Sequence, residues 1–432
     1  MTYADWEWRP LGELFEIGAG KTMSSLAREG AEKVPFLRTS NVLWDRMDLS
    51  SVDAMAIPPH ELPDKLLRPG DLLVCEGGEI GRAAVWNGQI EVCSFQNHLH
   101  RLRPRGSDVD PRFYVYFLQS AFTQLGIFEG AGNKTTIPNL SRSSLAALTV
   151  LHPPLPEQRL IVEALSAVRC SIEVHERSAV LAAELKQATL RHLFARGLHS
   201  EAVKDSEIGT VPASWAVVDF GSVRESLQYG TSIRCSYEST PFPVLRIPNI
   251  EPSKVNVRDL KFGNMTSEEA ERYQLHHGDV LIIRTNALIE RLGTCAVYEG
   301  QPQGALFASY LIRARLKRDL LDPYFAAYYF ASDRGTSVVG GRATPSADGK
   351  YNLNTGTIDR LPVPLPTLSE QRSIVEVLQA VDRKIDLHQQ KRARLHELFT
   401  ILLYKVMTGA VHLNELDTSV LVEVRAPGEP AA

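Results

Sequence analysis

Two short stretches of the sequence combine residue types that can carry catalysis. Gly18-Ala19-Gly20-Lys21-Thr22 resembles the end of a phosphate-binding loop, and Glu184-Leu185-Lys186 resembles the acid and lysine of a nuclease. A phosphate-binding loop, however, needs a glycine where Phe15 stands. Glu184 and Lys186 lie in a helical pattern with no upstream Pro-Asp partner, which favours a solvated helix face.

A third stretch, Pro153-Pro154, would suit the pocket of an adenine methyltransferase if Asn or Asp preceded it and Tyr followed it. His152 and Leu155 stand there instead. None of the three stretches completes a catalytic set, so the motifs do not predict an enzyme.

The composition is typical of a globular protein with several domains. The chain has 432 residues, 44% hydrophobic and 23% charged, and roughly 100–200 residues per domain predicts two to four domains. Its five cysteines form no CxxC pair, which argues against a disulfide framework and a zinc site and indicates a reducing cytoplasm. No signal peptide and no run of roughly 18 apolar residues is found, so we expect neither export nor membrane insertion.

The chain repeats itself at a nearly constant offset. Glu157-Gln158-Arg159 recurs as Glu370-Gln371-Arg372, and Asp110-Pro111 recurs as Asp322-Pro323. The offset between equivalent residues rises from 208 in the N-terminal half of each copy to 213 at its C-terminal end, as expected if loops of different length join equivalent elements. We interpret the chain as a tandem duplication.

Each copy has a mixed α/β (α+β) globular part followed by a helical part. Apolar runs at 71–74 and 280–283 predict buried strands, and 111–124 predicts a helix. Prolines precede the helical pattern, which runs from Glu157 to about Gly197 and from Glu370 to about Gly409. We expect globular domains at 1–153 and 205–365, helical spacers at 154–204 and 366–412, and a disordered tail at 413–432.

The two helical segments carry the spacing of a coiled coil. In the second, seam positions recur at intervals of four and three, whereas the first has small or polar residues in the middle. We interpret His175 and His388, which occupy equivalent positions, as seam residues that fix register rather than as metal ligands. Two equivalent long helices pack most simply antiparallel, which predicts a pseudo-two-fold molecule with the globular domains separated by the helices.

Four stretches carry a family resemblance: Pro-Leu-Pro-Glu-Gln-Arg at 154–159, its echo Leu-Ser-Glu-Gln-Arg at 368–372, the glycine-rich segment 70–82, and Lys204–Gly209 before Trp215. Together they resemble the specificity (S) subunit of Type I restriction-modification systems. The resemblance covers nearly the whole chain, from Trp6 to about Gly409.

The resemblance implies a cytoplasmic, non-catalytic subunit that binds double-stranded DNA. Each of two target recognition domains would contact one half of a bipartite, asymmetric sequence, while the helices set the gap and dock two methyltransferase (M) subunits. S-adenosylmethionine, ATP and Mg would belong to the M subunits and to restriction (R) subunits, and this chain would bind no cofactor or metal. The residues assigned to the helix seam or to subunit docking are Glu157, Gln158, Arg159, Ile161, Leu165, Ile172, His175, Glu370, Gln371, Arg372, Ile374, Leu378, Ile385 and His388.

The charge of the two domains does not by itself indicate nucleic acid. Residues 1–153 contain 15 basic and 18 acidic side chains and residues 205–365 contain 17 and 18, which gives −3 and −1. Since phosphate neutralisation supplies most non-specific affinity, we expect the isolated chain to bind DNA weakly. Base specificity needs only a few well-placed Arg, Lys, Asn or Gln side chains.

Candidate DNA-contacting residues lie in polar, glycine-rich loops or differ between the copies. A base-contacting residue should differ between halves that recognise different sequences, whereas identity also suits a structural hydrogen bond. That alternative stays open for Arg38, Asn41, Arg246 and Asn249. The other candidates are Lys21, Thr22, Gln96, Asn97, Asn133, Lys134, Thr135, Thr136 and Asn139 in the first copy, and Thr231, Ser232, Arg342, Thr344, Ser346, Lys350 and Tyr351 in the second.

Two other functions agree less well with the sequence. A self-contained DNA methyltransferase or nuclease is disfavoured by the missing motifs. A coiled-coil scaffold without DNA affinity would leave two large, diverged globular domains unexplained.

Overall fold

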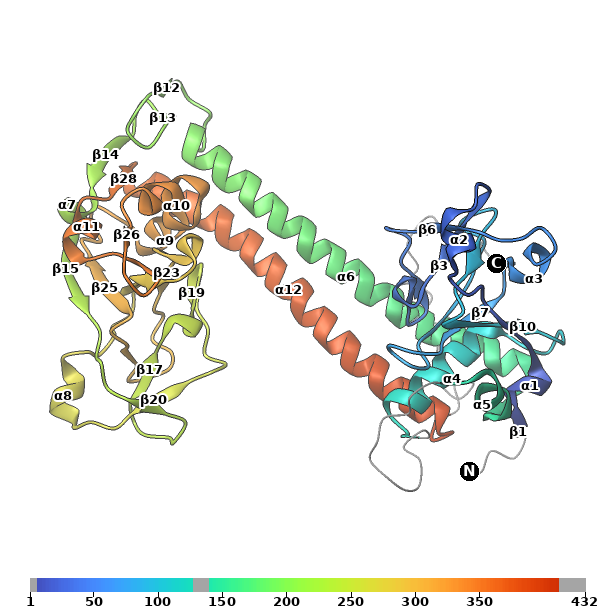
Figure 1. Ribbon diagram of the computed structural model, residues 1–432. Helices are drawn as coiled ribbons and strands as arrows, with labels where there is room; N and C mark the ends of the chain where they lie inside the picture. Colours follow the sequence, from blue (N-terminus) through green and yellow to red (C-terminus); the bar gives the residue numbers. More distant parts are fainter. Residues whose placement is uncertain (1–5, 127–139, 412–432) are drawn as a thin grey trace. The chain divides into compact units, whose positions relative to one another are not determined.

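The computed structural model describes residues 6–126 and 140–411, and the predicted tail at 413–432 lies outside them. The chain divides into two compact units, one formed by residues up to 176 together with those from 390 onward, and one formed by residues 177–389. The long helices α6 (Leu155–Arg196) and α12 (Leu368–Met407) each contribute one half to each unit (Figure 1). Among the described residues, no helix is long and apolar enough to cross a membrane.

The first unit contains an antiparallel sheet in the order β2-β10-β7-β8, a smaller sheet β6-β3-β9, and the pairs β1-β11 and β4-β5. Its strands are β1 (Glu7–Pro10), β2 (Phe15–Ala19), β3 (Lys33–Leu37), β4 (Val42–Leu43), β5 (Arg46–Met47), β6 (Asp53–Ala56), β7 (Leu72–Cys75), β8 (Ala83–Val85), β9 (Ser94–Phe95), β10 (Leu99–Pro104) and β11 (Thr149–His152). Its short helices are α1 (Leu11–Leu14), α2 (Ser25–Glu29), η1 (Thr39–Asn41), α3 (Leu62–Lys65), α4 (Pro111–Thr123) and α5 (Arg142–Ala147).

The second unit contains the sheet β15-β25-β21-β23-β19-β18, the sheets β16-β20-β17-β24 and β22-β27-β26, and the pairs β14-β28 and β12-β13. Its strands are β12 (Val203–Lys204), β13 (Val211–Pro212), β14 (Ala216–Asp219), β15 (Arg224–Tyr229), β16 (Cys235–Ser236), β17 (Pro243–Leu245), β18 (Ile250–Glu251), β19 (Ser253–Val255), β20 (Lys261–Gly263), β21 (Val280–Ile283), β22 (Thr285–Asn286), β23 (Cys295–Val297), β24 (Leu306–Phe307), β25 (Leu311–Leu316), β26 (Thr344–Pro345), β27 (Tyr351–Asn352) and β28 (Pro362–Leu365). Its short helices are α7 (Phe220–Val223), η2 (Ile247–Asn249), α8 (Ser267–Glu271), η3 (Ile289–Arg291), α9 (Pro323–Ala331), α10 (Asp333–Gly340) and α11 (Thr355–Asp359).

The two units have the same construction, which confirms the predicted duplication. Strands β15-β25-β21-β23 repeat the order β2-β10-β7-β8, the parallel pair β17-β24 repeats β3-β9, and β14-β28 repeats β1-β11. The second main sheet is wider because β19 pairs in parallel with β23, whereas the equivalent strands β4 and β5 pair only with each other. The loops between equivalent elements differ in length, as the drifting offset predicted.

Strand β7 is apolar throughout because both of its faces are buried. Leu72 and Val74 join the core formed with α4 and α6, whereas Leu73 and Cys75 join a second core. Alternate residues of a strand point to opposite faces, so a strand between two cores has no polar face. In the equivalent strand β21, alternate residues likewise belong to two different cores. Both predicted strands are confirmed.

Helix α4 is the predicted helix at 111–124, and its first turn shows why it begins there. The Asp110 side chain accepts a hydrogen bond from the backbone N–H of Arg112, and Pro111 occupies the first turn, where no amide is needed. Phe113 and Tyr114 are fully buried and meet edge to face. The helix thereby joins the main sheet to α6.

The halves of α6 and α12 run antiparallel within each unit. In the first unit the Arg169 guanidinium lies over the Phe399 ring, and one Nη of Arg392 is 3.4 Å from Glu176. In the second, Lys186 Nζ is 2.6 Å from Asp382. The two helices begin two residues before Glu157 and Glu370. Gly197 and Gly409 follow the ends of the helices with φ of 65° and 64°, a conformation that glycine adopts readily.

The predicted seam is apolar where it completes a domain core and polar near the middle of each helix. Ile161, Leu165 and Ile172 are buried in the first unit's core. Ile374 and Leu378 are buried in the second unit's core. Residues His175, Ile385 and His388 are half-buried, so each unit uses one end of the seam as part of its own hydrophobic core.

Candidate nucleic-acid interface

The candidate base-contacting segments of each unit lie side by side. In the first unit, the backbone of Lys21 donates to Phe95 O at 2.9 Å and accepts from the amide of Asn97 at 3.1 Å. In the second unit, Thr231 donates to Phe307 O at 2.8 Å and accepts from Ser309 at 2.8 Å. These bonds form equivalent isolated bridges in the two units, between Lys21 and Gln96 and between Thr231 and Ala308.

The glycine before each bridge is required by a close approach of two backbones. A Cβ on Gly20 would lie 2.2 Å from Gln96 O, and one on Gly230 would lie 2.3 Å from Ala308 O. The glycines of the stretch that resembles a phosphate loop therefore have a packing role. Lys21 Nζ is bound by both carboxylate oxygens of Glu61 at 2.8 Å, and this hydrogen bond lowers the pKa of Glu61.

The side chains of these segments differ in their access to a ligand. Thr22 and Ser232 are exposed, and Gln96 and Asn97 are half-buried. Thr231 is buried, and its Oγ1 accepts a 3.2 Å hydrogen bond from the amide of Ile233. The structure therefore leaves polar side chains exposed or half-buried at positions 22, 96 and 97 in one unit and at positions 232 and 309 in the other.

Asn41 and Asn249 have structural roles. Asn41 accepts from the Arg38 amide at 2.8 Å and donates to the carbonyls of Asp48 and Ser51. Asn249 makes the equivalent three bonds, beginning with the Arg246 amide at 2.9 Å. Both asparagines are buried with both donors engaged, so the prediction that they contact DNA is corrected in favour of the structural alternative.

Arg38 and Arg246 also hold nearby carboxylates. One Nη of Arg38 is 2.9 Å from Asp53, and one Nη of Arg246 is 2.9 Å from Asp259, whose pKa is lowered chiefly by this hydrogen bond. Both ion pairs are at least partly exposed, so these arginines remain accessible at the surface.

The candidate loop of the second unit forms a hairpin after α10. Strands β26 and β27, which carry Thr344 and Tyr351, pair with each other, and β27 also pairs with β22. At the turn, Lys350 Nζ is 2.6 Å from Asp348, and Ser346 Oγ also donates to that carboxylate. One Nη of Arg342 is 3.5 Å from Glu207. The equivalent candidates Asn133, Lys134, Thr135, Thr136 and Asn139 lie outside the described residues.

Arg284 joins the candidate segments of the second unit and was not among the predicted residues. Its guanidinium lies over the Tyr229 ring at 5.0 Å from the centroid, and donates to Ser309 O at 3.4 Å and Leu353 O at 3.3 Å. The equivalent residue of the first unit, at an offset of 208, is Glu76. That reversal of charge between the copies is the signal in the sequence that could have identified Arg284.

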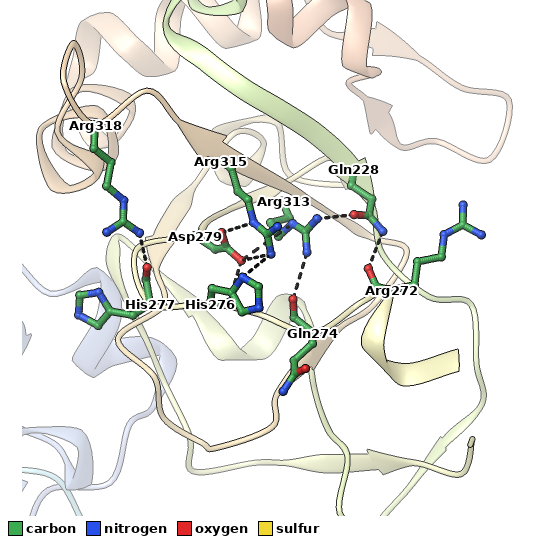
Figure 2. A network of polar contacts seen from close by, with 9 residues as sticks. All are labelled: Gln228, Arg272, Gln274, His276, His277, Asp279, Arg313, Arg315 and Arg318. Atoms are coloured by element: carbon green, nitrogen blue, oxygen red, sulfur yellow. Dashed lines mark hydrogen bonds and ion pairs between the residues drawn. The ribbon is translucent and has the colours of Figure 1, made fainter. Parts of the chain in front are cut away.

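A different pair of arginines, identical in the two copies, stabilises the fold. Figure 2 shows Arg313 and Arg315 of β25 beside the buried carboxylate of Asp279, with Arg315 Nε 2.9 Å from Oδ1 and Arg313 donating to the Gln274 carbonyl and to the Gln228 side chain. Burial lowers the pKa of Arg313. Arg101, Arg103 and Asp71 repeat the arrangement in the first unit, where the hydrogen bond to Asp71 raises the pKa of Arg103.

The repeated Glu-Gln-Arg motif ties each long helix to its own domain. Gln158 is fully buried, accepts from the Asp110 amide at 2.8 Å, and donates to the carbonyls of Asp108 and Pro153. Gln371 makes the equivalent three bonds, to Asp322, Leu320 and Pro366.

The glutamates of the motif bind tryptophans within the same unit. Trp6 Nε1 donates to Glu157 at 2.5 Å and Trp215 Nε1 donates to Glu370 at 3.1 Å. Of the motif, only Arg159 and Arg372 are exposed. Glu157, Gln158, Glu370 and Gln371, which the sequence assigns to the helix seam or to subunit docking, therefore hold each helix on its own domain.

The described residues contain no group of three or more His, Cys, Asp or Glu side chains that could hold a metal ion. Cys75, Cys93 and Cys295 are buried, and burial raises the pKa of Cys75 to about 11 and that of Cys93 to about 12. Thiols in such surroundings are protonated and poor nucleophiles.

The sequence matches the family model described as "Type I restriction modification DNA specificity domain" twice, over residues 3–181 and 212–397. The chain belongs to this family of specificity subunits. Each match includes one mixed domain and most of the helix that follows it, so the family match repeats in the same order as the structural duplication.

Relatives of this S subunit cover most of its length. The EcoKI specificity subunit of Escherichia coli (strain K12) is 24% identical over 87% of this chain and 82% of its own length. The MjaVIII specificity subunit of Methanocaldococcus jannaschii is 21% identical over 96% and 94%. As a member of a family of specificity subunits, the chain is not itself the enzyme of such a system.

Two solved structures share the fold of this S subunit. The Type I restriction-modification S subunit from M. genitalium has a TM-score of 0.55 at 16% identity, over 94% of this chain and 97% of that one. A chain from a structure titled for the assembly and conformational transition of the type I system has a TM-score of 0.54 at 18% identity, over 95% and 100%. The predicted fold of duplicated domains with two long helices is confirmed.

Proposed function

We propose that this S subunit recognises a bipartite, asymmetric sequence in double-stranded DNA, with one half contacted by the domain at 1–153 and the other by the domain at 205–365. One observation carries the proposal. The two domains share buried framework contacts, such as those of Asn41 and Asn249, while the segments that meet at Gln96 and at Ala308 carry different side chains. A shared framework with different surface chemistry suits the recognition of two different short sequences.

The helical spacers at 154–204 and 366–412 set the unspecified gap between the half-sites. Helix α6 follows the last strand of the first domain and leads into the second, and its 42 residues span about 63 Å at 1.5 Å per residue. A helix of that length is a rigid connection, so it fixes a distance rather than permitting a range.

Exposed apolar side chains at equivalent positions of the two helices support the docking of two M subunits. Val174 and Leu185 of α6 are 45% and 55% exposed, and the equivalent Leu387 and Leu398 of α12 are 49% and 46% exposed. Residues eleven apart lie on the same face of a helix, so each helix presents an apolar pair to solvent. One pair per helix suits one M subunit per helix.

The partners supply the chemistry and part of the DNA affinity. S-adenosylmethionine is assigned to the M subunits, and ATP and Mg to R subunits where these are present. Net charges of −3 and −1 on the domains favour weak DNA binding by the isolated chain. A chain that recognises cellular DNA in this complex works in the cytoplasm.

The test is base-resolution methylation mapping of DNA from cells that express this chain with its methyltransferase partner, compared with cells that express the methyltransferase alone. A split motif with a fixed gap that appears only when this chain is present supports the proposal. Association of the two proteins without any motif would contradict it. A chain that neither associates nor changes methylation would favour a scaffold without DNA affinity.

A further inference from the structure

Arg284 and Glu76 occupy the same place in the two domains. Each follows the central buried strand of its main sheet, β21 or β7. The amide of Arg284 donates to Tyr310 O and its carbonyl accepts from Leu353, while the amide of Glu76 donates to His98 O and its carbonyl accepts from Leu140. The backbone is therefore held in the same way, and only the side chain differs.

Both residues adjoin the segments in which the base-contacting candidates lie. Glu76 is bonded to His98, the residue after Asn97. Arg284 is bonded to Tyr310 and Ser309 and stacks on Tyr229, and Tyr229 and Tyr310 are both exposed aromatic side chains. A strand end anchored by two backbone hydrogen bonds is a firm support for a side chain that must meet a base edge.

The reversed charge sets this position apart from the framework of the domain. Framework positions carry the same residue in both units, as with Asp71 and Asp279 or Asn41 and Asn249, and make the same bonds. A side chain required only by the fold would keep its chemistry in both copies. A side chain that selects a base should differ between domains that recognise different sequences.

Both side chains have hydrogen-bonding capacity left for a ligand. Within the described part of the chain, the Glu76 carboxylate makes no hydrogen bond or ion pair, and it is half-buried rather than fully solvated. The Arg284 bonds to carbonyls are long, at 3.3 and 3.4 Å, and they engage only Nε and one Nη. Bonds of that length are weak and leave the outer edge of the guanidinium available.

The chemistry of the two side chains selects different base edges. Arginine donates two parallel hydrogen bonds to O6 and N7 of guanine, and glutamate accepts from the N4 amino group of cytosine. We propose that Arg284 selects a guanine in one half-site and that Glu76 selects a cytosine in the other. Each domain would then specify one G·C pair, the second domain through the guanine and the first through the cytosine. This assignment rests on the proposed function.

The test uses the full chain in complex with its methyltransferase partner and a duplex DNA library randomised at both half-sites, with methylation determined by sequencing. In the Arg284→Met variant, which keeps an unbranched side chain but removes every guanidinium donor, we expect preference for guanine at one position to fall about 5- to 150-fold. The other half-site and the gap should remain unchanged. An Arg284→Gln variant should shift preference at the same position toward adenine, which an amide binds.

The reciprocal variant, Glu76→Gln, should shift one position of the other half-site from cytosine to adenine. Arg258→Met and Glu91→Gln, at exposed positions of the two domains, are matched controls that should preserve the motif. A wild-type complex without a split motif would overturn the proposed function. A wild-type motif kept unchanged by all three test variants would overturn only the assignment of Arg284 and Glu76. Uniform loss of methylation at every site by both Arg284 variants, with an unchanged unfolding midpoint, would also overturn it, because such a residue does not discriminate among bases.

Discussion

The indole Nε1 of Trp215 donates a 3.1 Å hydrogen bond to Oε2 of Glu370. Trp215 is fully buried and directly precedes β14, the strand that pairs with β28 at the end of the same domain. Glu370 lies in the first turn of α12. The bond therefore joins the beginning of the domain to the beginning of the helix that leaves it, and Trp6 and Glu157 make the equivalent bond in the first unit.

Removal of the Glu370 carboxylate should destabilise the second unit. In Glu370→Ala the buried indole N–H loses its acceptor, and we expect the free energy of unfolding to fall by about 1–3 kcal/mol. Glu370→Gln keeps an acceptor oxygen and should cost less. Urea unfolding followed by tryptophan fluorescence measures both variants. Equal losses in the two variants would contradict a role for this hydrogen bond.

Tyr116 of the first unit and the equivalent Tyr328 of the second each donate a hydrogen bond to an aspartate, but the two aspartates lie in different elements. Asp45, whose side chain is 2% exposed, accepts from Tyr116 at 2.5 Å and lies 3.6 Å from Arg169 of α6. In the second unit Tyr328 donates at 2.6 Å to Asp382 of α12, which occupies the position of Arg169, while Ser253 occupies the position of Asp45. The carboxylate comes from the domain in one unit and from the helix in the other.

Reversing the charge at position 169 should destabilise the first unit unless the residues around that position are changed as well. Arg169→Asp alone places a carboxylate beside Asp45, and we expect a loss of roughly 3–5 kcal/mol because a buried ion pair is broken. Adding Asp45→Ser and Phe399→Lys gives these three positions the residues of the second unit, where Lys186 pairs with Asp382, and should recover at least half of that loss. Ser253 and Asp45 both have positive φ, of 69° and 54°, so serine fits this backbone. Thermal unfolding of the single and triple variants measures the coupling, and purely additive losses would refute it.

The ion pair at the tip of the β26-β27 hairpin should respond to acid. Hydrogen bonds from Lys350 and then Ser346 lower the pKa of Asp348 to about 2. Because the pKa is lower in the folded hairpin than its ordinary value of 3.8, the stabilisation is present above about pH 4 and is lost as the pH falls through 2. Carboxyl NMR titration of Asp348 should give that midpoint. Lys350→Ala should return it toward 3.8, and an unchanged midpoint in this variant would contradict the pairing.

The duplication, the two long helices and the family could be predicted from sequence because identical residues recur at nearly one offset. The roles of those identical residues could not. Gln158 bonds to the amide of Asp110, 48 positions away, and Glu157 bonds to Trp6, 151 positions away. Only folding brings these groups together, so the sequence predicts a helix that begins near the motif but does not show that Glu157 and Gln158 attach this helix to its domain.

The surroundings of Arg284 could not be predicted from the sequence, because they too are formed only by folding. It follows an apolar strand and has no motif around it, and the carbonyls that surround its guanidinium come from Ser309 and Leu353, 25 and 69 positions away. The logic that base-contacting residues differ between copies applied to it. Arg284 and Glu76 follow apolar strands and not polar, glycine-rich loops, whereas Asn41 and Asn249, which are identical in the copies, are buried in the framework.

The length of the helices should determine the gap between the half-sites. Each unit packs on one half of α6 and one half of α12, so both helices must be lengthened together, near Glu176 and near Gln389. One added heptad in each helix preserves the buried face, because seven residues are nearly two turns. It adds about 10 Å, or about three base pairs of DNA.

Methylation mapping of this paired-heptad variant should therefore give both original half-sites with a gap about three base pairs longer. A paired insertion of four residues is the matched control. It keeps each helix continuous, but four residues exceed one turn by about 40°, so the two halves of each helix are rotated relative to each other by that angle. We expect this variant to reduce methylation. An unchanged gap in the heptad variant would show that the helices do not measure the distance. Changed bases within either half-site would show that the domains do not recognise their sequences independently of the helices.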